Sequence, residues 1–104
     1  MAIELVTLND LMSEDGHQVP AYLLTPRRAT AGAVLVHGYG GCKEQMLGVA
    51  VRLADSGCAV LCVDLRGHGE HPAPLGSGLL LDLEAGLSRL RSAGRTIAVG
   101  HSLG

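Results

Sequence analysis

Aromatic residues and charges are scarce in this sequence, and long apolar runs are absent. Only two of the 104 residues are aromatic, Tyr22 and Tyr39, so the core must be built from aliphatic side chains. Charged residues make up 17% of the chain and the net charge is −2, which argues against a nucleic-acid partner. No apolar run approaches the roughly 18 residues that a membrane span needs. The first residues also lack the basic and apolar regions of a signal peptide.

Cysteine is scarce as well, and its pattern excludes a disulfide framework. The three cysteines are Cys42, Cys58 and Cys62, and no two of them form a C-x-x-C pair. An odd number of thiols without a C-x-x-C pair predicts a protein of a reducing, cytoplasmic setting. Three of the histidines have no ligand spacing with acidic or thiol partners, so the sequence predicts no metal site; they are His17, His68 and His71.

Apolar runs and helical spacing alternate along the chain. The predicted strands are residues 3–9, 19–25, 33–36, 59–63 and 96–99. The predicted helices are residues 43–56 and 80–92, in which apolar side chains recur at helical intervals. The first two strands predict an antiparallel hairpin, and Pro20 suggests an exposed or edge position for the second.

The order of these elements defines a fold class. A hairpin followed by β-α-β-α-β predicts an α/β protein with a mostly parallel sheet and right-handed crossovers. We expect residues 1–104 to form a single domain of this type, since no linker or internal repeat divides the chain. The continuous apolar runs at 33–36 and 59–63 are typical of strands that are buried on both faces.

A G-x-S-x-G pentapeptide, Gly100-His101-Ser102-Leu103-Gly104, follows the last predicted strand. A sharp turn from strand to helix at such a pentapeptide exposes the serine hydroxyl above the sheet, where it can attack a carbonyl. The glycines are needed because side chains there would clash with the neighbouring strand and helix. His101 is disfavoured as the base, since a residue next to the nucleophile points away from it.

Two further motifs follow the third and fourth predicted strands. Residues 37–41 read H-G-Y-G-G, and residues 64–69 read D-L-R-G-H-G. Together with the pentapeptide, in this order, they make the chain resemble the α/β-hydrolase family of serine esterases and lipases. The resemblance extends over nearly all of the sequence but only over the first part of a complete family domain, which ends here at the nucleophile elbow.

The resemblance implies roles for individual residues. Ser102 would be the nucleophile of an acyl-transfer reaction on a small carboxylic ester or related acyl compound, without a cofactor. The backbone N–H groups of Tyr39 and Leu103 would form the oxyanion hole. His37 would orient the loop rather than transfer protons. The residues that would support the loop and the elbow are His37, Gly38, Gly100 and Gly104.

The family places its catalytic acid and histidine after the nucleophile, and no residue follows Gly104 in this sequence. We therefore expect little turnover by the 104-residue chain alone, and self-association through the exposed edge of its last strand. A second hypothesis is a non-catalytic half-fold that serves as a binding or assembly module. A third, a nucleotide-binding domain, is disfavoured because Lys43 replaces the last glycine of G-x-G-x-x-G and no G-K-[ST] occurs.

The charged residues of the 64–69 segment suggest a triad or a metal site at first sight. The favoured interpretation is structural: Asp64, Arg66 and His68 pair with one another at the ends of strands and shape the rim of a pocket. On the second helix, Asp82 or Glu84 is expected in the first turn, where a negative charge suits the helix dipole.

Overall fold

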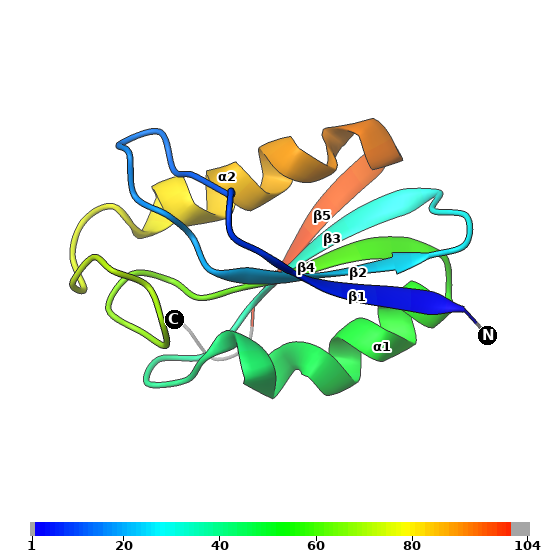
Figure 1. Ribbon diagram of the computed structural model, residues 1–104, viewed down its shortest axis with the longest axis horizontal. Coiled ribbons are helices and arrows are strands. Elements are labelled where there is room, and N and C mark those ends of the chain that lie inside the picture. Colours follow the sequence, from blue (N-terminus) through cyan, green and yellow to red (C-terminus); the bar gives the residue numbers. More distant parts are fainter. Residues whose placement is uncertain (1, 101–104) are drawn as a thin grey trace.

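The computed structural model describes residues 2–100, which form one five-stranded sheet with helices on both faces (Figure 1). The strands are β1 (Ile3–Leu8), β2 (Ala21–Pro26), β3 (Ala31–Val36), β4 (Cys58–Val63) and β5 (Arg95–Gly100). The helices are α1 (Leu47–Asp55) and α2 (Leu79–Leu90), with 3-10 turns at Lys43–Met46 and Arg91–Ala93. The predicted α/β class is confirmed, with every expected strand and helix present.

The strand order is β1-β2-β4-β3-β5. Strand β2 runs antiparallel to both of its neighbours, while β4, β3 and β5 are parallel to one another. The chain passes from β3 to β4 through α1, and then returns across β3 to β5 through α2. The connection that follows β3 and the connection that follows β4 therefore run toward opposite borders of the sheet. Ligands of open α/β sheets bind outside the carboxyl ends of the strands at such a reversal.

Two apolar cores fill the space between the sheet and its helices, with α1 on one face and α2 on the other (Figure 1). Consecutive residues of β3 alternate between them: Val34 packs in the α2 core and Leu35 in the α1 core. Strands β3 and β4 therefore need apolar residues on both faces, which explains their unbroken apolar runs. On α2, Gly86 allows a close approach, because a Cβ there would lie 3.1 Å from Val34.

The interpretation of Pro20 as a sign of an edge strand is wrong. Pro20 is buried, and β2 lies inside the sheet between β1 and β4. The proline directly precedes β2, so its missing N–H removes no hydrogen bond from the ladder. Its carbonyl instead accepts a hydrogen bond from the Asp64 N–H at 2.9 Å.

Strand β5 forms one border of the described sheet. Within residues 2–100 it pairs with β3 alone, and 48% of the Ile97 side chain is exposed. No described helix is long and apolar enough to cross a membrane.

Candidate active site

The carboxyl ends of β3, β4 and β5 bring two of the sequence motifs and the first residue of the third, Gly100, to one edge of the sheet. In the strand register, Val36 of β3 lies opposite Val63 of β4 and Gly100 of β5. The 37–41 and 64–69 segments therefore leave the sheet side by side, next to the start of the pentapeptide. Three of the predicted site residues, Ser102, Leu103 and Gly104, lie outside the described residues.

The 37–41 loop is a tight turn. The Gly41 N–H donates to the Gly38 carbonyl at 2.9 Å, and Gly40 has a φ of +80°, a conformation that favours glycine. The Tyr39 side chain is 75% exposed. Among the described residues, no acceptor takes the Tyr39 N–H. This amide is the one predicted to donate to an oxyanion.

His37 is completely buried behind this loop. Its Nε2 accepts a hydrogen bond from the Leu65 N–H at 3.1 Å, so the ring proton must lie on Nδ1. Nδ1 then donates to the Gly38 carbonyl at 2.8 Å. Both ring nitrogens are engaged with backbone, so His37 ties the loop after β3 to the loop after β4.

The prediction that Asp64, Arg66 and His68 pair with one another is wrong. Asp64 forms an ion pair with Lys43, Arg66 reaches toward α2, and the His68 ring contacts the 37–41 loop. The three side chains do not meet because the chain turns sharply through residues 64–69, so that they leave the backbone on different sides. Each of the three therefore connects this segment to a different part of the fold.

Asp64 forms its ion pair with Lys43, which follows the 37–41 loop in the chain. Asp64 accepts hydrogen bonds from the Lys43 N–H at 2.7 Å, from Lys43 Nζ at 3.0 Å and from the Glu70 N–H at 2.9 Å. Lys43 is buried, with Nζ also 2.7 Å from Glu70. Burial alone would lower the pKa of Lys43, but its hydrogen bonds to Glu70 and Asp64 outweigh this effect and raise it.

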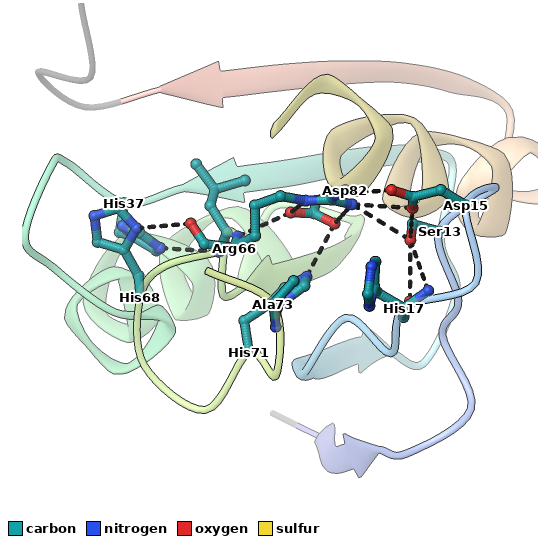
Figure 2. A network of polar contacts seen from close by, with 10 residues as sticks. Ser13, Asp15, His17, His37, Arg66, His68, His71, Ala73 and Asp82 are labelled. Carbon is teal, nitrogen blue, oxygen red and sulfur yellow. Dashed lines mark hydrogen bonds and ion pairs between the residues drawn. The ribbon is translucent and has the colours of Figure 1, made fainter. Parts of the chain in front are cut away.

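A second polar cluster joins the 64–69 segment to α2 and to the loop after β1 (Figure 2). The Arg66 guanidinium donates to both carboxylate oxygens of Asp82, at 2.9 and 3.1 Å, and to Asp15 at 2.7 Å. Asp82 also accepts from His71 Nε2 at 3.0 Å. Burial raises the pKa of Asp82, but the hydrogen bonds from Arg66 outweigh it, so the pKa lies below its usual range.

Asp82 does stand in the first turn of α2, as expected. Its role is larger than the expected interaction with the helix dipole, because it is buried and shared by Arg66 and His71. Sequence reasoning missed this cluster. One signal was present: Asp82 shares a helical face with Gly86 and Leu90, which are also buried. A carboxylate on a buried face requires a charged or hydrogen-bonding partner.

The contact of His68 with the 37–41 loop was also not predicted from the sequence. Its Nε2 accepts a hydrogen bond from the Gly40 N–H at 2.9 Å, and its Nδ1 lies 3.2 Å from the Arg66 carbonyl. The ring packs against His37, with 4.8 Å between the ring centroids, and meets the Tyr39 ring edge-on at 5.6 Å. The two motifs after β3 and β4 therefore touch through aromatic rings as well as hydrogen bonds.

The comparisons with known proteins agree with this geometry. A family model described as the alpha/beta hydrolase family matches residues 33–104, which is more than half of the chain. The chain belongs to the alpha/beta hydrolase family. No curated protein matches the sequence. The predicted resemblance is thereby confirmed at the level of the family.

Solved alpha/beta hydrolases share the fold. An esterase from Pyrococcus furiosus is 22% identical, with a TM-score of 0.76 over 95% of this chain and 40% of that one. Est1E from Butyrivibrio proteoclasticus, solved with ferulic acid, is 23% identical, with a TM-score of 0.74 over 92% of this chain and 42% of that one. An alpha/beta hydrolase from Novosphingobium aromaticivorans is 26% identical, with a TM-score of 0.70 over 100% of this chain and 37% of that one. The chain thus spans about two fifths of the length of the first of these hydrolases.

Other features of the described hydrolase fold do not form a second candidate site. Within residues 2–100, no group of three His, Cys, Asp or Glu side chains could hold a metal ion. An open groove lies at the opposite end of the sheet, between the β2–β3 connection and the end of α1, and is lined in part by Arg27, Arg28 and Asp55. None of the predicted site residues within residues 2–100 lines this groove.

Proposed function

We propose that this chain supplies the nucleophile and the oxyanion hole of a serine hydrolase that acts on carboxylic esters or related acyl compounds. The observation that carries the proposal is the register that sets Val36, Val63 and Gly100 level at one edge of the sheet. It sets the 37–41 and 64–69 segments beside Gly100, the first residue of the pentapeptide. The esterases among the solved structures support ester chemistry, and we propose that residues 1–104 are a partial domain of that fold.

In the proposed reaction, Ser102 Oγ attacks the acyl carbonyl carbon, and the electron pair of the C=O bond moves onto its oxygen. The N–H groups of Tyr39 and Leu103 stabilise that oxyanion. The alcohol then leaves with a proton as the acyl-enzyme forms, and water releases the acid in a second round. His37 and Gly38 hold the loop that carries the Tyr39 amide.

The base that takes the Ser102 proton is not assigned within residues 1–104. Within residues 2–100, three histidines are buried and do not fit this role, because each uses both ring nitrogens in hydrogen bonds; they are His37, His68 and His71. We therefore expect the 104-residue chain alone to hydrolyse simple esters slowly or not at all.

The decisive experiment compares Ser102→Ala with Ser92→Ala, a matched loss of one hydroxyl at an exposed position after α2. Hydrolysis of p-nitrophenyl esters and labelling by a fluorophosphonate are measured on the 104-residue chain and on any longer product of the same reading frame. We expect turnover and labelling in the longer product, their loss in S102A, and wild-type values in S92A. Turnover that survives in S102A would overturn the proposal.

A second candidate is a non-catalytic half-fold that binds or assembles with a partner. The observation that favours it is the border at β5, where Ile97 is half exposed and the strand is paired on one side within residues 2–100. A stable complex in which another polypeptide pairs with β5, together with an absence of Ser102-dependent turnover, would support this function instead.

We also propose a cytoplasmic location for the protein. Its three cysteines are free, which suits a reducing compartment. Burial raises the pKa of Cys62 to about 12, so this thiol stays protonated and inert at neutral pH. Fractionation of cells that express the tagged gene would test the location, and recovery from an exported fraction would contradict it.

A further inference from the structure

Two consecutive peptide planes flank Tyr39, and each is held by a different histidine. The Gly38 carbonyl, in the plane before Tyr39, accepts from His37 Nδ1 at 2.8 Å and from the Gly41 N–H at 2.9 Å. The Gly40 N–H, in the plane after Tyr39, donates to His68 Nε2 at 2.9 Å. The Tyr39 N–H lies in the same peptide plane as the Gly38 carbonyl. In a trans peptide the two groups point in opposite directions, so a carbonyl held toward His37 turns the Tyr39 N–H away from His37.

The His68 ring is itself held in one orientation and one tautomer. A backbone N–H only donates, so Nε2 must be the unprotonated nitrogen and Nδ1 carries the proton. That proton points at the Arg66 carbonyl, 3.2 Å away. The ring packs against His37 and meets the Tyr39 ring edge-on, and the residue is only 9% exposed. His68 therefore presents a lone pair to the loop in a fixed direction.

Two residues that precede His68 anchor the segment that carries it. Asp64 is bound to Lys43, and Arg66 is bound to Asp82, both through buried ion pairs. After His68, Gly69 has a φ of +52°, and a Cβ there would collide with the Asp64 carboxylate. The D-L-R-G-H-G segment thus brings an imidazole against the neighbouring loop with little freedom to move.

We propose that His68 is a positioning residue of the oxyanion loop. By accepting the Gly40 N–H, it fixes the second of the two peptide planes around Tyr39. With the backbone held on both sides of Tyr39, the first plane cannot rotate freely, and the Tyr39 N–H that it carries stays directed at the developing oxyanion. This inference rests on the proposed function, since it gives His68 a part in the same acyl-transfer reaction. It replaces the structural role at the pocket rim that the sequence suggested for this residue.

The test uses the 104-residue chain and any longer product of the same reading frame, each with two substitutions. His68→Leu removes the acceptor, whereas His68→Gln places an amide oxygen near the position of Nε2 and keeps it. We expect kcat for Ser102-dependent ester hydrolysis to fall roughly 10- to 100-fold in H68L, less than the loss of a whole oxyanion donor. KM should stay within about twofold of the wild-type value, because the loop is proposed to act on the transition state rather than on substrate binding. H68Q should recover most of kcat, because it keeps the hydrogen-bond acceptor.

His71→Asn is the matched control. It removes another buried imidazole contact of the same connection, the hydrogen bond to Asp82, so it should lower the melting temperature without lowering kcat. If H68L does not fold, His68→Asn takes its place, because its shorter amide does not reach the Gly40 N–H. A spectroscopic readout is independent of turnover: the N–N coupling across the hydrogen bond between Gly40 N–H and His68 Nε2, measured by NMR on the ¹⁵N-labelled protein.

Each outcome decides the proposal. The coupling in the wild type, together with the split between kcat and KM and the rescue by H68Q, supports it. An active wild type whose H68L variant keeps kcat, an H68Q variant as slow as H68L, or a missing coupling overturns the role of His68 alone. A wild type that shows the coupling but no Ser102-dependent turnover overturns the proposed function, and the role of His68 falls with it.

Discussion

Asp82 shows how a single buried side chain connects three parts of this fold. Its carboxylate is inaccessible to solvent and binds Arg66 from the β4–α2 connection, which in turn binds Asp15 from the β1–β2 connection. Removing one partner of a buried ion pair leaves the other charge uncompensated, which typically costs several kcal/mol. The strength of the cluster can therefore be measured by neutralising this one residue.

We predict that Asp82→Asn lowers the free energy of unfolding by about 3 kcal/mol at pH 7, as measured by urea denaturation. The control is Asp10→Asn, which breaks the exposed ion pair of Asp10 with Arg89 and should cost under about 1 kcal/mol. Equal losses in the two variants would contradict the assignment of Asp82 as a buried anchor.

The same pair predicts a dependence on pH. The folded-state pKa of Asp82 is lowered, so its stabilisation is fully present above the pKa of an unfolded carboxyl, about 3.9. It is lost as the pH falls through the lower folded-state value. The difference in unfolding free energy between the wild type and D82N should therefore be constant from pH 7 to about pH 5 and shrink below about pH 4. A difference that is unchanged at pH 3 would contradict the lowered pKa.

At the scale of the elements, the connection after β4 is restrained by close contacts around the Asp64 carboxylate. Gly69 has a positive φ and faces the Asp64 carboxylate, which already accepts three hydrogen bonds. Gly16, in the β1–β2 connection, also has a positive φ, of +89°, but a Cβ there would meet open space. The two glycines thus differ in their surroundings rather than in the sign of φ.

This difference gives a matched pair of substitutions. Gly16→Ala should cost about 1 kcal/mol, the strain of a left-handed residue. Gly69→Ala should cost that amount and also displace the Asp64 carboxylate from Lys43, so its melting temperature should fall further. Thermal unfolding of both variants measures the difference. A G69A variant as stable as G16A would show that the Asp64 site adapts without cost.

The strands and helices could be predicted because their signal is local. The apolar runs at 33–36 and 59–63 and the helical spacing along α2 each lie within one short window. The partners of the polar residues could not be predicted, since a charged side chain can pair with any opposite charge that the fold brings near. Arg66 and Asp15 are 51 residues apart, and no periodicity links them. His68 was misjudged for the same reason, because its partner is a backbone N–H, which leaves no trace in the sequence.

For the whole molecule, the two borders of the described sheet differ in how their apolar residues are spaced. In β1, Leu5 and Val6 lie between Glu4 and Thr7, whereas β5 carries three consecutive apolar residues, Ile97, Ala98 and Val99, after Arg95 and Thr96. Ile97 is 48% exposed, and β5 pairs on one side only within the described residues. A strand border with apolar side chains and free backbone groups is a template for pairing with another chain.

We therefore predict that the isolated 104-residue chain self-associates through β5. Light scattering should give a mass above that of a single chain, 10.7 kDa, and the mass should rise with concentration. Ile97→Lys should reduce the association, because a charge on the border strand opposes pairing. Val51→Lys is the control: its side chain is equally exposed, at 48%, but lies on α1. A wild-type chain that stays monodisperse and monomeric would contradict the prediction, and equal effects of the two lysines would point to net charge rather than to β5.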